Sequence, residues 1–182
     1  MYVYDYLALP AASFIGTYLI TSHILAILDW TQPEWYKARE ISPRPKLTFQ
    51  LYIAIMKRTI LNITVSVAVA AIFWHIRITR KPELRDILTA ILQLLICFLC
   101  SELWFWTGHY LSHNPLFYAK VHSLHHTFPR PIALSSLYCT LWEMLLINLP
   151  LATGMPTILQ LHPYVNSLWN CGLAWYIAMK HC

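Results

Sequence analysis

Long hydrophobic runs alternate with short polar segments along the whole chain of 182 residues. The runs occupy residues 7–28, 59–76, 87–106, 134–151 and 161–179. A helix needs about 20 mostly apolar residues to cross the hydrocarbon core of a bilayer. Irregular backbone cannot face lipid, so every run is expected to be helical. The pattern predicts an all-α integral membrane protein with about four to five transmembrane or membrane-embedded helices.

Composition supports a lipid environment. Hydrophobic residues make up 58% of the chain and charged residues only 12%, whereas soluble domains carry about 25% charged residues. The net charge is +5. The basic residues gather in short loops rather than on one face with interleaved aromatic residues, which argues against nucleic-acid binding. The first ten residues contain no Lys or Arg, so the first run is interpreted as a retained anchor rather than a cleaved signal.

The loops between the runs set the expected orientation. Six basic residues lie between the first and second runs, and four lie between the second and third. Positive charge in short loops favours the cytosolic side, so the first loop is expected in the cytosol. The segment after the third run, and His181 near the end of the chain, then fall on the same side.

A histidine-rich segment, HYLSHNPLFYAKVHSLHH, follows the third run. Its five histidines are His109, His113, His122, His125 and His126. Because His109 and His113 are four residues apart, a helix would project them from one face. His122 and His126 repeat this spacing. The residue before a proline avoids helical geometry, so Asn114-Pro115 is expected to turn the chain and let two histidine-bearing helices face one another.

This arrangement indicates a metal site. Neutral imidazole is a good ligand for iron, zinc, copper and nickel, and several imidazoles at the end of a membrane run would hold metal close to a lipid's oxidisable carbon. The alternative is a histidine-rich interfacial loop without metal. Acidic residues at membrane depth tend to face a site or a partner. Glu102 and Glu143 are therefore candidates to accept a hydrogen bond from a ligand's other ring nitrogen; Glu102 is equally consistent with an interfacial residue at the membrane surface.

These motifs resemble the fatty acid hydroxylase and sterol desaturase superfamily, and most closely its C-4 methylsterol oxidases. The likeness covers the chain from about Glu102 to its end. It rests on the boxes HYLSH and HSLHH, the LFY segment between them, and later positions: Pro131, residues 135–138, Glu143, Trp169, His181 and Cys182. Acyl-CoA desaturases place their first two boxes much further apart and are a poorer match.

The resemblance implies a multi-pass, non-haem di-iron oxygenase of the endoplasmic reticulum membrane, with a cytosolic cap that carries the histidine boxes. Such an enzyme uses O2 and electrons from NAD(P)H, delivered by cytochrome b5 or a reductase, to oxidise a sterol or acyl lipid. Residues 1–86 would form an N-terminal transmembrane hairpin with its loops, and residues 87–182 a fatty acid hydroxylase-like domain. The implied iron ligands, with no catalytic residue beyond them, are His109, His113, His122, His125, His126 and His181.

Departures from the family pattern bear on activity. The family has a further HxxHH box after the position of His181, and this sequence has none. Thr140 stands where many relatives have a histidine, and Tyr110 where they often have an arginine. The expectation is a C-terminally truncated domain that holds at least one metal poorly. The alternative is a non-catalytic relative or fragment that partners an intact family member. A zinc hydrolase is disfavoured because no HExxH or HxxEH acid accompanies the boxes.

Overall fold

The computed structural model describes residues 2–38, 47–77, 83–128 and 130–181. All regular structure in these ranges is helical, so the predicted all-α class is confirmed. The helices are α1 (Tyr2–Thr31), α2 (Glu34–Lys37), α3 (Phe49–Arg77), α4 (Ile87–Ser112), α5 (Pro115–Val121), α6 (Leu141–Glu143), α7 (Leu149–Ile158) and α8 (Pro163–Lys180). Shorter elements are the 3-10 turns η1 (His125–Thr127) and η2 (Ala133–Ser135) and the π-helix η3 (Met144–Asn148).

Three helical segments in the described residues are long and apolar enough to cross a membrane: Tyr6–Thr31, Phe49–His75 and Ile87–Ser112. The second begins at Phe49 rather than at the predicted residue 59. Thr48 starts it by accepting a hydrogen bond from the Leu51 N–H on its hydroxyl at 3.2 Å. The third continues past the predicted residue 106 to Ser112, so His109 lies on the last turns of a spanning helix.

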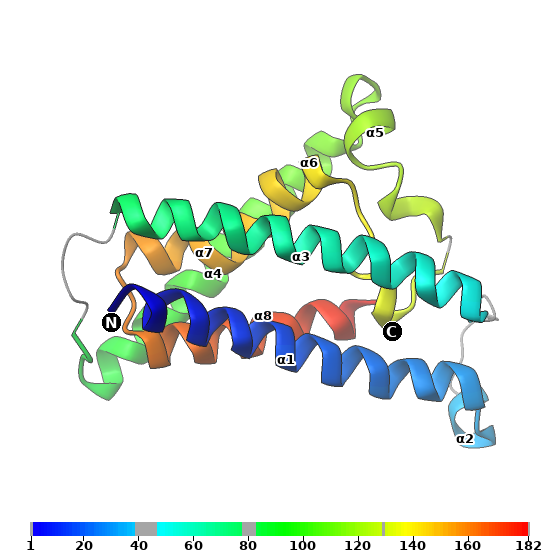
Figure 1. Cartoon of the computed structure of the whole chain (residues 1–182), viewed down its shortest axis with the longest axis horizontal. Coiled ribbons are helices and arrows are strands. Elements are labelled where there is room, and N and C mark those ends of the chain that lie inside the picture. Colours follow the sequence, from blue (N-terminus) through cyan, green and yellow to red (C-terminus); the bar gives the residue numbers. More distant parts are fainter. Residues whose placement is uncertain (1, 39–46, 78–82, 129, 182) are drawn as a thin grey trace.

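The helices form a bundle in which the C-terminal helix lies beside the N-terminal one (Figure 1). α8 lies along α1, while α7 packs against α3 and α4. Cys97, Leu151 and Trp169 belong to one buried apolar cluster that joins α4, α7 and α8. The basic residues at 39–46 and 78–82 that indicated the orientation (Arg39, Arg44, Lys46, Arg80 and Lys81) lie outside the described residues, so the cytosolic placement stays a prediction.

The prediction of one helix over residues 134–151 is wrong. The chain there passes through η2, an irregular stretch, α6 and η3 before α7 begins, and Leu134, Leu137 and Cys139 are fully buried. Polar side chains of the neighbouring helices donate hydrogen bonds to backbone carbonyl oxygens of this irregular segment. Tyr18 donates to the Leu134 carbonyl at 2.9 Å, Asn62 donates to the carbonyls of Leu137 and Cys139 at 3.0 Å, and Arg58 donates to the Cys139 carbonyl at 2.8 Å. Irregular backbone is tolerated at this depth because protein, not lipid, surrounds it.

Candidate metal centre

The end of α4 and the turn after it position the first two histidine boxes. α4 ends at Ser112 with His113 as its cap. Asn114 starts α5 by accepting a hydrogen bond from the Leu116 N–H at 3.0 Å, and Pro115 takes the first helical position. The predicted turn at Asn114-Pro115 is therefore present. α5 folds back so that His122 caps its end.

A glycine allows close packing beneath the first box. A side-chain carbon added at Gly108 would lie 3.2 Å from Cγ1 and 3.3 Å from Cγ2 of Ile147, closer than such atoms normally pack. Ile147 belongs to η3, which directly follows Glu143. The absence of a side chain at Gly108 therefore lets the end of α4, which carries His109, approach the segment that carries Glu143.

Four imidazoles converge on one point. Nε2 of His109 lies 3.2 Å from Nε2 of His113, and Nε2 of His122 lies 2.9 Å from Nε2 of His126. The rings of His109 and His122, one from each box, have centroids 4.4 Å apart. One ligand nitrogen of each of the four lies within 4.8 Å of the others. Nitrogens that bind one metal at about 2.1 Å lie roughly 3 to 4 Å apart, so a small adjustment would place all four on one ion.

The remaining two candidate histidines form a second pair beside this cluster. Nε2 of His125 lies 3.5 Å from Nε2 of His181, which follows the last helix. Nδ1 of His181 donates to the Ile177 carbonyl oxygen at 2.9 Å. That hydrogen bond fixes the proton on Nδ1 and leaves the lone pair of Nε2 free to bind a metal.

Glu143 lies behind both groups of histidines. Its Oε1 lies 3.1 Å from Nδ1 of His122 and 3.7 Å from Nδ1 of His125. The carboxylate is 3% exposed and His122 is fully buried. The atoms are close but are not aligned as hydrogen bonds, and both Nδ1 atoms and Oε2 of Glu143 are buried without a hydrogen-bond partner. A carboxylate in this position directs the Nε2 side of His122 toward the cluster.

Burial controls the charge of these groups. It lowers the pKa of His125 to about 3, and the neighbouring histidines add to that shift. It also lowers the pKa values of His126 and His181. Burial raises the pKa of Glu143, whereas the adjacent His122 opposes that rise. The three histidines are therefore neutral near pH 7, which is the form that binds metal.

Glu102, the other candidate carboxylate, forms no hydrogen bond or ion pair with an imidazole of the described residues. Both of its oxygens lie 3.4 Å from Nζ of Lys180. Lys180 also sits over the ring of Tyr176 at 4.3 Å and the ring of Phe105 at 5.1 Å. Of the two carboxylates named from the sequence, the structure therefore brings only Glu143 against the histidines.

Thr140 has a structural role that its position in the chain did not indicate. Its hydroxyl donates to the Val121 carbonyl oxygen at 2.5 Å and accepts from the Glu143 N–H at 3.1 Å. The residue thus joins the end of α5, next to His122, to the start of α6, which carries Glu143. The sequence does contain a signal for this role, because Thr followed three residues later by Glu is a common pattern at the start of a helix.

Comparison with known proteins gives a consistent family signal. Residues 94–182 match the sequence model of the family described as fatty acid hydroxylase. The chain is 27% identical to Fatty acid hydroxylase ahd1 of Mycosarcoma maydis, over 85% of this chain and 42% of that protein. It is 33% identical to Fatty acid hydroxylase domain-containing protein 2 of Homo sapiens, over 57% of this chain and 32% of that protein.

A plant relative extends the set to sterol enzymes. The chain is 27% identical to Methylsterol monooxygenase 1-3 of Arabidopsis thaliana, over 80% of this chain and 50% of that protein. The chain thus spans half or less of the length of each of these relatives. No solved structure matches it.

Proposed function

We propose that the chain, whose residues 94–182 match the sequence model of the fatty acid hydroxylase family, is a metal-dependent lipid oxygenase of the membrane. One observation carries the proposal: the ligand nitrogens of His109, His113, His122 and His126 gather within 4.8 Å of one another at the end of a helix able to span the bilayer. A metal held there would lie close to the carbon atoms of a membrane lipid. We also propose that residues 1–86 form an N-terminal transmembrane hairpin with its loops. Residues 87–182, which carry the histidines, then form the fatty acid hydroxylase-like domain.

The residues present fit a transition-metal ion. All four converging ligands are imidazole nitrogens, which suit iron as well as zinc and copper. The buried Glu143 oxygen without a hydrogen-bond partner is a further argument, because a buried carboxylate is costly unless a positive charge lies nearby. We propose that His109, His113, His122 and His126 hold one iron, and that His125 and His181 contribute to a second, as in a non-haem di-iron oxygenase.

The bound metal would supply the redox chemistry that activates O2. The protein's own residues position the ligands and exclude water. Glu143 and Thr140 hold the His122 side of the cluster in place, and the hydrogen bond from His181 to Ile177 keeps Nε2 of His181 in its ligand form. The full burial of His122 excludes water from the inner side of the cluster.

The proposed reaction oxidises an unactivated C–H bond of a sterol or long acyl lipid, as in the C-4 methylsterol oxidases. One atom of O2 enters the C–H bond, and the other leaves as water with electrons from NAD(P)H and protons from solvent. Cytochrome b5 or a reductase would deliver the electrons. Relatives named as hydroxylases and methylsterol monooxygenases support this reaction type. The spanning helices support a multi-pass membrane placement, and the endoplasmic reticulum is proposed from the resemblance to the methylsterol oxidases alone.

The test uses the full chain, purified in nanodiscs and loaded with iron. Iron per chain is measured, and a 4-methylsterol is supplied with labelled 18O2, NADH, cytochrome b5 and its reductase. Retained iron and 18O in the product support the proposal. His122→Ala should lose both iron and product, whereas His75→Ala, outside the cluster, should keep both.

The same assay distinguishes the proposed oxygenase from the alternative, a non-catalytic membrane relative that partners an intact family member. That alternative predicts poorly held metal and no 18O incorporation by the chain alone, and activity only when the intact relative is added. If no metal binds at all, the proposed metal centre is wrong and the histidines form an interfacial segment without metal.

A further inference from the structure

An open apolar groove lies on the outer face of the protein, between the end of α4, α5 and η3. Its volume is about 370 Å³, within the range of about 300–1,000 Å³ that ligand sites usually occupy. No charged side chain lines it among the described residues, and most of its wall is apolar or aromatic: Trp104, Leu111, Phe117, Val121, Leu146 and Ile147. The chemistry of this wall suits a hydrocarbon chain.

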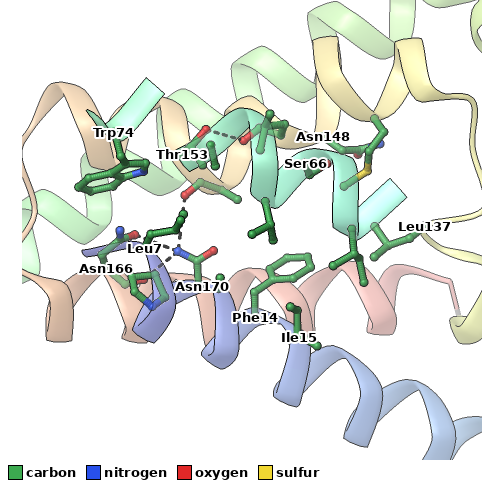
Figure 2. Close-up of a pocket in the computed structure, with 18 of the residues that line it drawn as sticks. Leu7, Phe14, Ile15, Ser66, Trp74, Leu137, Asn148, Thr153, Asn166 and Asn170 are labelled. Atoms are coloured by element: carbon green, nitrogen blue, oxygen red, sulfur yellow. Dashed lines mark hydrogen bonds between the residues drawn. The ribbon is translucent and has the colours of Figure 1, made fainter. Parts of the chain in front are cut away.

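The cavity inside the bundle is much smaller. Phe14, Trp74 and Asn170 are among the residues that line it (Figure 2), and its volume is about 70 Å³. A buried water molecule needs about 10–15 Å³ of such space, so the cavity has room for a few water molecules but not for a lipid chain. Of these two spaces, only the outer groove can take a hydrocarbon chain.

The groove faces the lipid that surrounds the bundle. α5 and α6 stand to one side of α1 and α3, within the length of these helices rather than beyond their ends (Figure 1). Because α1 and α3 contain segments able to span the membrane, a displacement to their side is a displacement into the surrounding lipid. The side chains of Leu111, Phe117 and Leu146 are about half exposed along the groove. A lipid chain can therefore enter the groove directly from the bilayer.

The three elements that form the groove also carry residues of the metal cluster. The last turns of α4 carry His109, α5 leads directly into His122, and η3 directly follows Glu143. Gly108 and Ile147, which pack closely against each other, both line the groove. A chain that fills the groove therefore contacts all three elements at once.

We propose that an acyl chain of a bilayer phospholipid fills this groove and acts as a structural part of the metal centre. The chain supplies packing contacts that join α4, α5 and η3. Without it, the apolar walls lose those contacts, and the two histidine boxes are held together less firmly. The occupancy of the groove does not depend on metal, whereas the effect on metal affinity rests on the proposed function.

Photo-cross-linking of the metal-free full chain tests the occupancy. The chain is placed in nanodiscs of phosphatidylcholine, a small fraction of which carries a diazirine at one of several depths along an acyl chain. Leu111 and Leu146 should be labelled several-fold more than Leu92 and Leu99, which are similarly exposed on α4 but lie outside the groove. The reason is that a chain held in a groove stays in contact longer than one on an open helix surface. Equal labelling of the two pairs would overturn the proposal.

Two other occupants give different results in the same experiment. If an excess of a 4-methylsterol removes the additional labelling of Leu111 and Leu146, the groove belongs to the substrate. If the additional labelling is present in nanodiscs that hold one chain and absent from those that hold two, the groove is an interface with a second copy of this chain. Either result would overturn the proposal.

A variant that fills the groove is the next test. Thr107 lies on α4, is exposed and lines the groove, so Thr107→Phe should remove the additional labelling of Leu111 and Leu146. Leu103→Phe places the same ring on an exposed part of α4 outside the groove and should retain it. An unchanged circular dichroism spectrum shows that each variant is folded. If folded Thr107→Phe is labelled like the unaltered chain, the acyl chain lies elsewhere and the proposal is wrong.

Removal of phospholipid tests the effect on the metal, with zinc as a redox-inert probe. In detergent alone, the chain should bind zinc about tenfold more weakly than in the same detergent with phosphatidylcholine, because the site is less preorganised. Thr107→Phe should show a smaller difference, since its ring occupies the groove in both conditions. Gly154→Leu, in a separate groove between α3 and α7, should respond to lipid like the unaltered chain. Equal zinc affinity of the unaltered chain in both conditions would overturn the structural role of the lipid.

Failure of this proposal can be told apart from failure of the proposed function. Additional labelling of Leu111 and Leu146 in a chain that binds no metal would support the lipid site and overturn the metal-dependent oxygenase. Lipid oxidation by a chain without the additional labelling would support the oxygenase and overturn the lipid site.

Discussion

Oε1 of Glu143 lies 3.1 Å from Nδ1 of His122, in a site where both side chains are almost completely removed from solvent. A carboxylate on the outer nitrogen of a metal-binding histidine orients the ring and strengthens it as a ligand. Glu143 also approaches His125 at 3.7 Å, so it contacts both the four-histidine cluster and the second pair.

Glu143→Gln should therefore weaken metal binding by about 10- to 100-fold, because the amide keeps the shape but loses the negative charge. The affinity is measured by competition with a chelator of known strength. Glu102→Gln is the matched control, since Glu102 pairs with Lys180 rather than with a histidine. An equal loss of affinity in both variants would show that the contact with His122 has no special effect.

Thr140→Val should destabilise the fold by about 1–2 kcal/mol, because it removes the cap of α6 and the hydrogen bond to the Val121 carbonyl. Reversible unfolding in mixed detergent measures the change. Thr140→Ser keeps the hydroxyl and should recover most of the loss. If Ser is as destabilising as Val, the hydrogen bonds are not the cause.

Asn62→Leu should cost about 2–3 kcal/mol, since it leaves the buried carbonyls of Leu137 and Cys139 with fewer donors. Thr64→Leu lies on an exposed face of the same helix and should change the free energy of unfolding little. A neutral effect of Asn62→Leu would mean that water reaches the irregular segment and replaces the lost hydrogen bonds.

The metal-free protein should lose stability as the pH falls below 6.5. The pKa of His125 is about 3 in the folded state against 6.5 for the unperturbed group, so the unfolded chain binds a proton that the folded chain does not. This contribution is fully present above pH 6.5 and is lost progressively down to about pH 3. Each such histidine costs up to about 1.4 kcal/mol per pH unit in that window.

Unfolding titrations at pH 7, 6 and 5 test this pH dependence. His125→Gln should reduce the slope of the unfolding free energy against pH, because it removes the histidine whose pKa burial lowers to about 3. An unchanged slope in that variant would assign the acid sensitivity to other residues.

The convergence of the four histidines could be predicted from the sequence because its determinants are local. The spacing of His109 from His113 fixes a shared helix face, and Asn114-Pro115 fixes the turn that brings back the second box. His181 was named only through the family resemblance, since nothing local connects it with His125. The structure places their Nε2 atoms 3.5 Å apart.

The irregular path of residues 134–151 could not be predicted from hydropathy. Apolar side chains there indicate burial, but they do not distinguish a lipid-facing helix from a segment enclosed by protein. The difference depends on Tyr18, Arg58 and Asn62, which lie far away in the chain and supply donors to its carbonyls. The ion pair of Glu102 could not be predicted for the same reason, because its partner Lys180 lies on the last helix.

X-ray absorption on the iron-loaded full chain tests the central claim most directly. We predict nitrogen ligands at about 2.1 Å with the multiple-scattering pattern of several imidazoles. A double variant, His109→Ala with His122→Ala, should lose that signal, whereas His75→Ala with His162→Ala should retain it. Iron with the same imidazole signal in both double variants, or no bound iron in the unaltered chain, would contradict a metal centre built from these histidines.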